Sequence, residues 1–597
     1  MRIMLEVIKR FTLPILVVTI ILLGTLGGAH SQVQGPRYGG SLVMAQSNEP
    51  GSIFYYATGA TEAGVIATNI FDGLVAYDVA FNPIPNLAGS WDRSADQLTW
   101  TFHLVRNATF HDGVPFTSAD VKFTYDNLVQ LSASGRAYFP ITSGDLWITT
   151  PDNYTVVFNW KAPFIEAIKD MGVFAAPIAP KHLYQASCPA TPCVLGDVRQ
   201  NQWDFKPVGT GPFKFQDWVR GDHVTLVRNE KYFKAGLPYL DKLTIRFLPE
   251  ANTLLAAMKS GEVDYDPDGF PISLVSQLNA DPAFSPIPVR NTALGHTVRL
   301  RFNLDSPIFK DVRVRRAFSL AIDRQTIIDK AAFGYGKVSK STFPDTPSLA
   351  KYRSSNVPYP TYDPAAAEKL LDDAGYKRGP DGVRFTLDRF TVTTGKPEAY
   401  GDPAQLIKDM LKKVGIEAKI VLADEDTVDK WVYVDRPRAF DIALFLSRSG
   451  PFPYFSAKAY VSSYIQRVIL TNVGYNNSQI DKLYSQIRSM TDEDQQVQLY
   501  RQVDEILNRD LPELWIYDYE YAQPIRNTFQ GHSFYDVFPE SGPLTTVWWT
   551  QGSPMAATTA TSSLAGSPAA SQTWTAAAVV VLVVLVGAYF AYSKKKK

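Results

Sequence analysis

Apolar and polar residues alternate along several stretches of the chain, and this alternation predicts half-buried β-strands. Leu243, Ile245 and Phe247 are each separated by one polar residue. Side chains of a strand point alternately to opposite faces, so a period of two places these three residues on one buried face. The stretches 98–104 and 155–160 alternate in the same way. We therefore expect the region around these two stretches to be rich in strands.

A helix is predicted directly after the strand at 243–247. Pro249 ends the strand, and three apolar residues between 254 and 258 then lie at helical spacing. Gly261 follows the last apolar turn, where a residue in the left-handed conformation commonly ends a helix. A second strand is predicted at 263–265. The strand–helix–strand order indicates a βαβ crossover whose two strands pair in parallel.

In the C-terminal half of the chain, predicted helices and strands follow one another. Asp363 precedes Pro364, the favoured order of an N-cap and a first helical residue, and Gly375 follows the last apolar turn. A second helix is predicted from an apolar stripe at 406–414 that ends at a glycine. The other predicted elements are a strand at 418–422, a buried strand at 440–446 and a helix around 500–507.

The N-terminus has the layout of a secretory signal peptide. Basic residues come first, followed by an apolar run from Phe11 to Leu26 and then by small residues. We expect residues 1–30 to be a signal peptide, with a permanent N-terminal anchor as the alternative. A signal peptide directs the rest of the chain out of the cytoplasm.

The C-terminus combines a polar stalk with an apolar run. Residues 553–574 are rich in Ser, Thr and Ala, which is typical of a flexible stalk. Residues 575–592 are apolar and would span roughly 27 Å as a helix, close to the core thickness of a bilayer, about 30 Å. Lys594–Lys597 follow and are expected to stay cytoplasmic. These features predict an outward-facing body held by a C-terminal transmembrane helix; a removed sorting tail is the alternative.

Charge and cysteine content narrow the function classes. The chain has 59 basic and 59 acidic residues and no basic stripe, so nucleic-acid binding is not expected. Its two cysteines, Cys188 and Cys193, are separated by four residues and suit a local disulfide in an oxidising compartment. Free buried thiols are the alternative, and two thiols alone make a poor metal site.

Three glycosylation sequons agree with an extracellular location. They begin at Asn107, Asn153 and Asn476. Sequons of this length also arise by chance, so they support the location without establishing it.

The chain lacks the motifs that commonly mark catalytic sites. It has no Gly-x-Ser-x-Gly elbow, phosphate-binding loop, His-Glu-x-x-His or paired-cysteine zinc ribbon. His111-Asp112 looks like an acid–base pair, but a turn before a helix starting near Ser118 explains it. Asp264–Gly269 matches the first half of a calcium loop, yet the twelfth position is Val275 and not glutamate. We therefore expect no metal, no cofactor and no enzymatic activity.

Five segments along residues 39–550 carry recognisable motifs: Phe102–Leu104 with Phe110–Gly113 and Phe116–Tyr125, Val208–Phe213, Arg228–Asp264, Phe302–Leu304 with Asp311–Phe318 and Ala321–Arg324, and Tyr362–Tyr376. In this order they resemble the signature motifs of the family 5 extracellular solute-binding proteins. These proteins are the receptors of peptide- and nickel-type ABC importers. The signal peptide, stalk and anchor resemble the arrangement of archaeal surface binding proteins.

The resemblance implies an α/β, two-lobed periplasmic-binding-protein-like fold with a hinge and an extra accessory domain. Lobe I is assembled from separate segments, and the two chain crossings near residues 295 and 520 form the hinge. The implied organisation is lobe I at 37–79, 206–295 and 520–549, an accessory strand-rich domain at 80–205, and lobe II at 296–519.

The resemblance also indicates where a ligand binds. Peptide-binding members typically carry an aspartate just after the strand equivalent to 440–446, and it captures the peptide amine. Arg448 lies where that acid is expected; an arginine repels an ammonium but pairs well with a carboxylate or with hydroxyls. The alternative is that Arg448 is solvated and the nearby aromatic residues are core. The candidate ligand-binding residues are Tyr55, Tyr56, Asn303, Trp431, Arg448, Phe452 and Tyr454.

Three function classes follow. The first two are an extracytoplasmic substrate-binding protein of an ABC importer that captures a peptide, or an oligosaccharide, between two closing lobes. The third is a surface enzyme or an adhesion module. The family's commonest ligand favours a peptide, whereas the missing aspartate favours a sugar. The expected partners are the ligand, permease and ATPase subunits and the membrane, and the expected state is a monomer.

Overall fold

The computed structural model describes most of the chain between residues 35 and 554. All of these residues belong to the unit Met1–Pro554, and Met555–Lys597 form a second unit. The predicted signal peptide, Tyr55, Cys188 and Cys193, the stalk beyond Pro554 and the predicted transmembrane helix lie outside the described residues. The described residues are 35–54, 56, 61–78, 81–129, 145–173, 176–187, 202–291, 295–358, 360–394, 399–450, 452–462, 474–532, 544–551 and 553–554.

The strand predicted at 243–247 is β11 (Lys242–Phe247), part of a sheet that we call the N-terminal sheet. Within the described residues its strand order is β2-β11-β10-β9. β2 runs parallel to β11, and the other pairs are antiparallel. Leu243 and Ile245 are fully buried, as the alternation predicts. The other strands are β2 (Ser41–Gln46), β10 (His223–Arg228) and β9 (Phe213–Val219).

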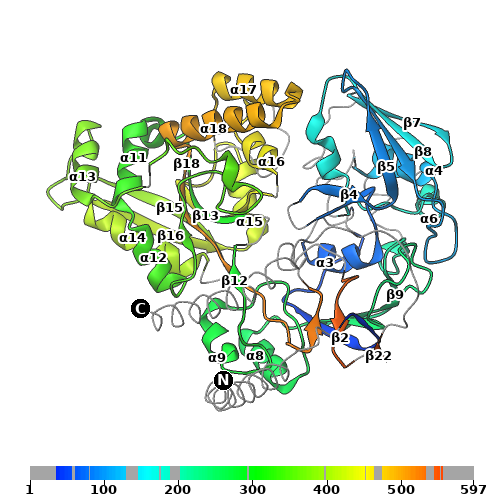
Figure 1. Cartoon of the computed structure of the whole chain (residues 1–597). Helices are drawn as coiled ribbons and strands as arrows, with labels where there is room; N and C mark the ends of the chain where they lie inside the picture. The colour runs from blue at the N-terminus through cyan, green and yellow to red at the C-terminus, as the bar shows by residue number, and fades with distance from the viewer. Residues whose placement is uncertain are drawn as a thin grey trace, which may run out of the picture. The chain divides into compact units, whose positions relative to one another are not determined.

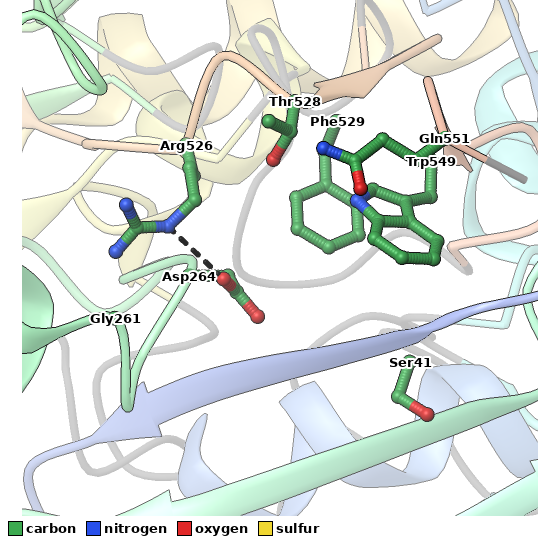
Figure 2. A pocket seen from close by; sticks show the side chains of 8 residues that line it. All are labelled: Ser41, Gly261, Asp264, Arg526, Thr528, Phe529, Trp549 and Gln551. Atoms are coloured by element: carbon green, nitrogen blue, oxygen red, sulfur yellow. Dashed lines mark hydrogen bonds and ion pairs between the residues drawn. The ribbon is translucent and has the colours of Figure 1, made fainter.

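The helix predicted after β11 is α8 (Ala251–Ser260), and Gly261 ends it with a φ of 85°. The chain then returns beside β2, where Tyr265 forms a parallel bridge with Met44; Figure 2 shows the preceding Gly261 and Asp264. The crossover is therefore present, but the predicted pairing of this return segment with β11 is wrong. The reason is that β2, from far earlier in the chain, occupies the position beside β11.

The predicted strand-rich region forms an antiparallel sheet, the accessory sheet. Its order in the described part of the chain is β5-β6-β8-β7. Every second residue of β8 is buried, in agreement with its alternating sequence. Apolar residues of this sheet and of the N-terminal sheet form one continuous core. The strands are β5 (Ala88–Arg93), β6 (Thr99–Leu104), β7 (Leu146–Asp152) and β8 (Thr155–Trp160).

A third sheet, the C-terminal sheet, has the order β14-β18-β13-β17-β15-β16 among the described residues. β15 is parallel to both of its neighbours, whereas β13 is antiparallel to β17 and β18. Helix α14 packs against β16, and α11 packs against α13 (green in Figure 1). The elements are β13 (His296–Phe302), β14 (Lys337–Val338), β15 (Phe385–Thr393), β16 (Ile416–Ala423), β17 (Ile442–Arg448), β18 (Glu513–Asp518), α11 (Val312–Ala321), α13 (Pro364–Asp373) and α14 (Gly401–Lys413).

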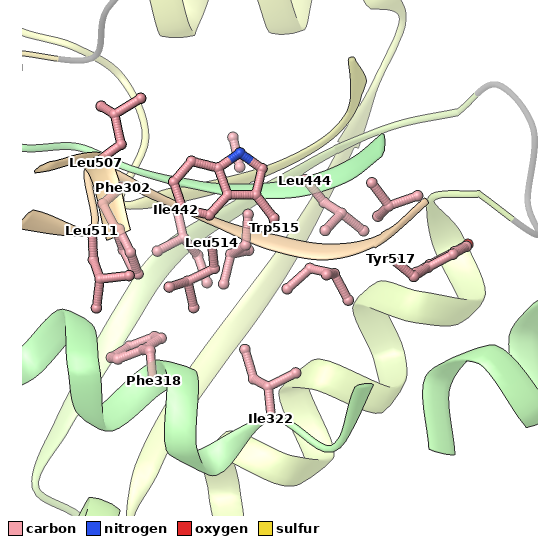
Figure 3. Packing of buried hydrophobic residues seen from close by; sticks show 14 of the residues in the cluster. Phe302, Phe318, Ile322, Ile442, Leu444, Leu507, Leu511, Leu514, Trp515 and Tyr517 are labelled. Carbon is pink, nitrogen blue, oxygen red and sulfur yellow. The ribbon is translucent and has the colours of Figure 1, made fainter. Parts of the chain in front are cut away.

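A second large core belongs to the C-terminal sheet. Phe302 of β13, Phe318 of α11 and Leu514 of β18 are almost completely buried in it. Figure 3 shows these side chains packed between the strands and the helices. Because the C-terminal sheet has a core separate from the one that the other two sheets share, the body agrees with the predicted two-lobed architecture.

Helix boundaries follow the predicted caps. Asp363 accepts a hydrogen bond from the Ala366 N–H at the start of α13, and Pro364 takes the first helical position. Gly375 and Gly415 follow α13 and α14 with φ values of 95° and 83°. Glycine adopts such values without a steric penalty, so it ends both helices.

The two chain connections between the cores lie side by side. β12 (Val289–Arg290) precedes the C-terminal sheet, β19 (Tyr521–Ala522) follows it, and the two strands pair antiparallel. This pairing lies beside the crossings predicted near residues 295 and 520. The two connections are therefore tied to each other where a hinge is expected.

The remaining elements are short or flank the three sheets. No helix of the described residues has the length and apolar character needed to cross a membrane. The further helices are α3 (Thr61–Ile70), α4 (Ser118–Phe123), α6 (Lys181–Tyr184), α9 (Val275–Asn279), α10 (Pro307–Lys310), α12 (Arg324–Ala331), α15 (Glu425–Asp429), α16 (Pro453–Lys458), α17 (Ser478–Ser489) and α18 (Glu493–Asp510). The further strands are β1 (Arg37–Tyr38), β3 (Val75–Tyr77), β4 (Pro83–Pro85), β20 (Phe529–Gln530), β21 (Trp548–Trp549) and β22 (Ser553–Pro554).

Candidate ligand-binding site

The buried side chain of His111 is hydrogen-bonded to the backbone of the glycine turn at Gly209–Gly211. The Gly209 N–H donates to His111 Nδ1 at 3.3 Å, and His111 Nε2 lies 3.0 Å from the Gly211 carbonyl oxygen. Burial lowers the pKa of His111 to about 4, so the ring is neutral at pH 7. The neighbouring Asp112 contacts His182 instead. These contacts agree with a structural turn before α4, which begins at the predicted Ser118.

Asp72 is a second buried polar centre, and two of its partners, Thr210 and Tyr232, belong to the motif segments. Its carboxylate accepts hydrogen bonds from Asn86 at 3.2 Å, and from Thr210 and Tyr232, both at 3.1 Å. Burial raises the pKa of Asp72, and the Lys234 ammonium and the hydrogen bonds oppose this shift. Three distant segments therefore meet at one carboxylate in the core.

The acidic run at 264–268 contributes to the scaffold. Asp264 pairs with Arg526 at 3.2 Å. Asp268 accepts hydrogen bonds from the backbone N–H and the hydroxyl of Ser47. Within the described residues, no group of His, Cys, Asp or Glu side chains is arranged to hold a metal ion.

A surface cavity of about 350 Å³ lies at the Asp264–Arg526 ion pair (Figure 2). The candidate ligand-binding residues in the described part of the chain do not line it. We therefore do not assign the ligand to this cavity. Its lining residues are Ser41, Gly261, Asp264, Arg526, Thr528, Phe529, Trp549 and Gln551.

Two of the predicted ligand-binding residues bond to the protein backbone. Tyr56 is 2% exposed, and its hydroxyl donates to the Pro177 carbonyl at 3.0 Å. The Asn303 amide donates to the Phe440 carbonyl at 2.9 Å, just before β17. Both side chains support the scaffold in this structure, and their ligand role stays a prediction.

Trp431 and Arg448 keep exposed surface. Trp431 is half-buried in the turn of helix Lys430–Val434, and the guanidinium carbon of Arg389 lies 4.5 Å from the centre of its ring. Arg448 is exposed at the end of β17. Both residues therefore remain candidates for contact with a ligand.

Phe452 and Tyr454 lie where the two cores meet. The ring of Phe452 is 6.0 Å from that of Tyr77, which packs against both cores. Tyr454 is fully buried, with its ring 6.2 Å from Phe164. Aromatic rings at such distances stabilise a contact beyond the area that they bury. The predicted site residues thus include part of the contact between the two cores.

Buried polar groups reinforce this contact, and the sequence analysis missed them. The Tyr500 hydroxyl of α18 lies 3.2 and 3.1 Å from the two carboxylate oxygens of Glu166. Burial raises the pKa of both Glu166 and Asp170. Burial also lowers the pKa of Lys458 to about 8, although the nearby Asp170 opposes this shift. Isolated charged residues in short helices, such as these, are usually exposed, so no sequence pattern predicts their burial.

A buried ion-pair cluster lies on the C-terminal sheet. The Glu513 carboxylate accepts hydrogen bonds from Arg299 and Arg301, both at 2.9 Å, and from the Tyr460 hydroxyl at 2.5 Å. Burial acts to raise the pKa of Glu513, but the two arginines bring it below its ordinary value. Arg299 and Arg301 alternate with apolar residues. That pattern is typical of a strand with one solvated face, so the sequence predicts exposed arginines and not a buried cluster.

The end of β17 and the residue that follows it are hydrogen-bonded to this cluster. Arg299 Nη2 donates to the Ser449 hydroxyl at 2.7 Å, and Arg301 Nη2 donates to the Ser447 hydroxyl at 3.1 Å. The resemblance predicts Arg448 at the position of the amine-capturing acid. The arginines that contact the segment are buried ones on the neighbouring strand.

The three sequon asparagines are exposed. Asn107 donates a hydrogen bond to the Phe233 carbonyl, and the Asn476 amide oxygen accepts one from Ser462. Asn153 lies in the turn between β7 and β8. Exposure is compatible with glycosylation, which stays a prediction.

Comparison with known proteins identifies the family. The model of the bacterial extracellular solute-binding proteins, family 5, matches residues 82–466. The oligopeptide-binding protein AppA of Bacillus subtilis is 27% identical over 557 residues, which are 88% of this chain and 95% of AppA. A putative ABC transporter peptide-binding protein of Brucella ovis is 31% identical over 386 residues, which are 64% of this chain and 69% of that protein.

Two solved structures are similar over most of the body. AppA from Bacillus subtilis in complex with a nonapeptide matches with a TM-score of 0.71 and 25% identity, covering 86% of this chain and 100% of AppA. The periplasmic binding protein DppA from Helicobacter pylori, in complex with the peptide STSA, matches with a TM-score of 0.70 and 25% identity, covering 86% of this chain and 99% of DppA. The chain therefore belongs to the family 5 extracellular solute-binding proteins.

Proposed function

We propose that this protein is the extracytoplasmic substrate-binding protein of an ABC importer and that it captures a peptide between two closing lobes. One observation carries the proposal: a relative solved with a bound nonapeptide matches 86% of this chain. The ligand is delivered to a membrane permease with its ATPase subunits. The protein acts as a monomer and performs no chemical reaction on the ligand.

The proposed motion is a hinge closure at the β12–β19 pair. The two connections pair through Val289 with Ala522 and through Arg290 with Tyr521. A few element-terminal residues are able to absorb the backbone rotations of such a closure. Ligand contacts from both lobes then favour the closed form over the open one. The lobe boundaries are those predicted from the sequence, with lobe II at 296–519.

We also propose the cellular location that the sequence predicts. A signal peptide at 1–30 exports the chain, and the apolar run at 575–592 anchors it with the body facing outward. The exposed sequon asparagines support an outward-facing body. Cys188 and Cys193 form a local disulfide there. An anchor keeps the receptor at a high local concentration near its permease.

An oligosaccharide is the second candidate ligand. Trp431 is half-buried, and the guanidinium carbon of Arg389 lies 4.5 Å from the centre of its ring. Such a ring offers an aromatic face of the kind that stacks on sugar rings. At the end of β17, the residues that contact the buried arginines are Ser447 and Ser449 and not an aspartate. These two observations favour a ligand without a free amine.

Thermal unfolding of the purified full-length protein in the presence of peptides and of oligosaccharides tests the proposal. A ligand present at 100 times its Kd stabilises the folded state by about 2.7 kcal/mol. We expect oligopeptides to raise the Tm. A rise with oligosaccharides alone would move the function to the second candidate, and chemical conversion of the bound compound would contradict both.

A further inference from the structure

Arg301, the more exposed arginine of the buried ion-pair cluster, has a hydrogen-bond donor to spare. Its Nε pairs with Glu513 and its Nη2 with Ser447. Nη1 makes no hydrogen bond to any residue in the described ranges. The Arg301 side chain is 10% exposed, against 4% for Arg299. A donor of Arg301 is thus left for a group that is not part of the described protein.

The charges around Arg301 do not balance within the cluster. Two arginines share the single carboxylate of Glu513. Asp518, another acid of β18, accepts hydrogen bonds from Thr297 and from the Asp345 N–H, and its charge acts on Arg299. Arg301 therefore retains attraction for a further anion, which strengthens in a buried, weakly screened environment.

Aromatic rings flank the same guanidinium. Its carbon lies 5.5 Å from the ring centre of Tyr433 and 4.9 Å from that of Phe445. Both aromatic side chains are only partly buried. Tyr433 belongs to the same helical turn as Trp431, a candidate ligand-binding residue. Rings on a guanidinium fix its plane and exclude water, which favours a paired, planar anion such as a carboxylate.

We infer that Arg301, supported by Arg299 and flanked by Tyr433 and Phe445, binds a carboxylate of the ligand and makes the receptor select acidic ligands. The inference deepens the proposed function and rests on it. Arg448 lies where the resemblance predicts an amine-capturing acid, and the adjacent Ser449 is hydrogen-bonded to Arg299. The polarity of this part of the site is therefore opposite to that of a site that captures an ammonium group.

Calorimetric titration of the full-length protein with matched peptide pairs tests the inference. One set of pairs exchanges a Glu side chain for Gln at each position, and the other exchanges the C-terminal carboxylate for an amide. We expect at least one exchange to weaken binding about tenfold or more. The set in which this occurs identifies a side chain or the C-terminus as the source of the carboxylate. Equal affinities in all pairs would overturn the inference while leaving peptide capture intact.

The variant Arg301→Gln assigns the selectivity to this residue. Glu513 keeps Arg299 and Tyr460 as partners in this variant, so the cluster is not left with an unpaired acid. We expect the acidic peptide to bind about tenfold more weakly and its neutral partner to bind unchanged. The matched control is Arg313→Gln, which removes an exposed arginine of α11 paired with Asp311. Equal losses for both peptides, or equal effects of both variants, would overturn the assignment.

Two further comparisons separate a structural role from a binding role. Arg301→Lys keeps the positive charge but cannot form two parallel hydrogen bonds to a carboxylate. We therefore expect this variant to prefer the acidic peptide more than Arg301→Gln does, but less than the wild type. A lower Tm in both Arg301 variants, together with an unchanged preference for the acidic peptide, would show that Arg301 has a structural role only. If no peptide binds, peptide capture is wrong, and the same comparison uses uronate-containing against neutral oligosaccharides. A preference for the uronate supports the carboxylate site, and equal or absent binding overturns it.

Discussion

Hydrogen bonds of single buried side chains connect segments that are far apart in the sequence. His111 joins the glycine turn at Gly209–Gly211, and Asp72 joins Thr210 of the same turn. Buried polar side chains that are satisfied in this way fix a unique arrangement of distant segments. Chemical reactivity is therefore not needed to explain the histidine next to Asp112.

The pH dependence of stability tests the position of His111. Burial lowers its pKa to about 4 in the folded state, against about 6.5 when unfolded. The unfolded state binds more protons between these values, so stability is lost as the pH falls from about 6.5 towards 4, by about 3 kcal/mol in total. We expect His111→Asn to flatten this part of the pH profile in urea unfolding. An unchanged slope for His111→Asn would contradict the account.

At the scale of elements, the glycine turn at Gly209–Gly211 packs directly against the end of α3. A Cβ placed on Gly209 would lie 2.1 Å from the carbonyl oxygen of Ile70, the last residue of α3. The Gly211 N–H donates to that same oxygen at 2.8 Å. The turn therefore needs glycine because a backbone approaches it closely, and the contact fixes α3 against β9.

Gly209→Ala should destabilise the protein by about 1–3 kcal/mol, because neither backbone can move without breaking the hydrogen bond to Ile70. The measurement is the free energy of unfolding in guanidinium chloride. Gly51→Ala is the matched control, since a Cβ there meets nothing within 4 Å, and it should change stability by less than about 0.5 kcal/mol. Similar values for the two variants would show that the close approach is absent.

Local elements of this fold follow from local sequence, whereas their pairing does not. The caps at Asp363, Gly261 and Gly375 act within a few residues, so the helices that they bound were predictable. The neighbour of β11 is β2, about 200 residues earlier in the chain, and no local pattern specifies that partner. The ion-pair cluster was not predictable for a similar reason. Charged residues such as Arg301 and Glu513 are expected at the surface, and only the pairing of β13 with β18 brings them together.

At the scale of the whole body, two cores are joined by polar and aromatic contacts. Tyr500 belongs to the core of the C-terminal sheet, and Glu166 lies in the helical turn after Phe164, a residue of the other core. Phe452 and Tyr454, predicted as ligand residues, take part in the same contact. If the lobes open and close about the β12–β19 pair, this contact belongs to the closed form.

Tyr500→Phe tests that assignment. The variant removes the hydroxyl and leaves the buried Glu166 with one donor fewer, which destabilises the contact without removing the ring. We expect the Kd for a peptide ligand to rise about two- to tenfold, measured by calorimetric titration. The control Tyr376→Phe, three residues after the end of α13 and distant in sequence from these contacts, should leave the Kd unchanged. An unchanged Kd for Tyr500→Phe would remove this contact from the closure mechanism.

The central claim is that the protein captures a peptide reversibly and without changing it. The most direct measurement is isothermal titration of the full-length protein with oligopeptides, followed by mass analysis of the peptide released on denaturation. The account predicts saturable binding of one peptide per chain and recovery of the intact peptide. Absence of binding by every oligopeptide tested, or recovery of cleaved products, would contradict it.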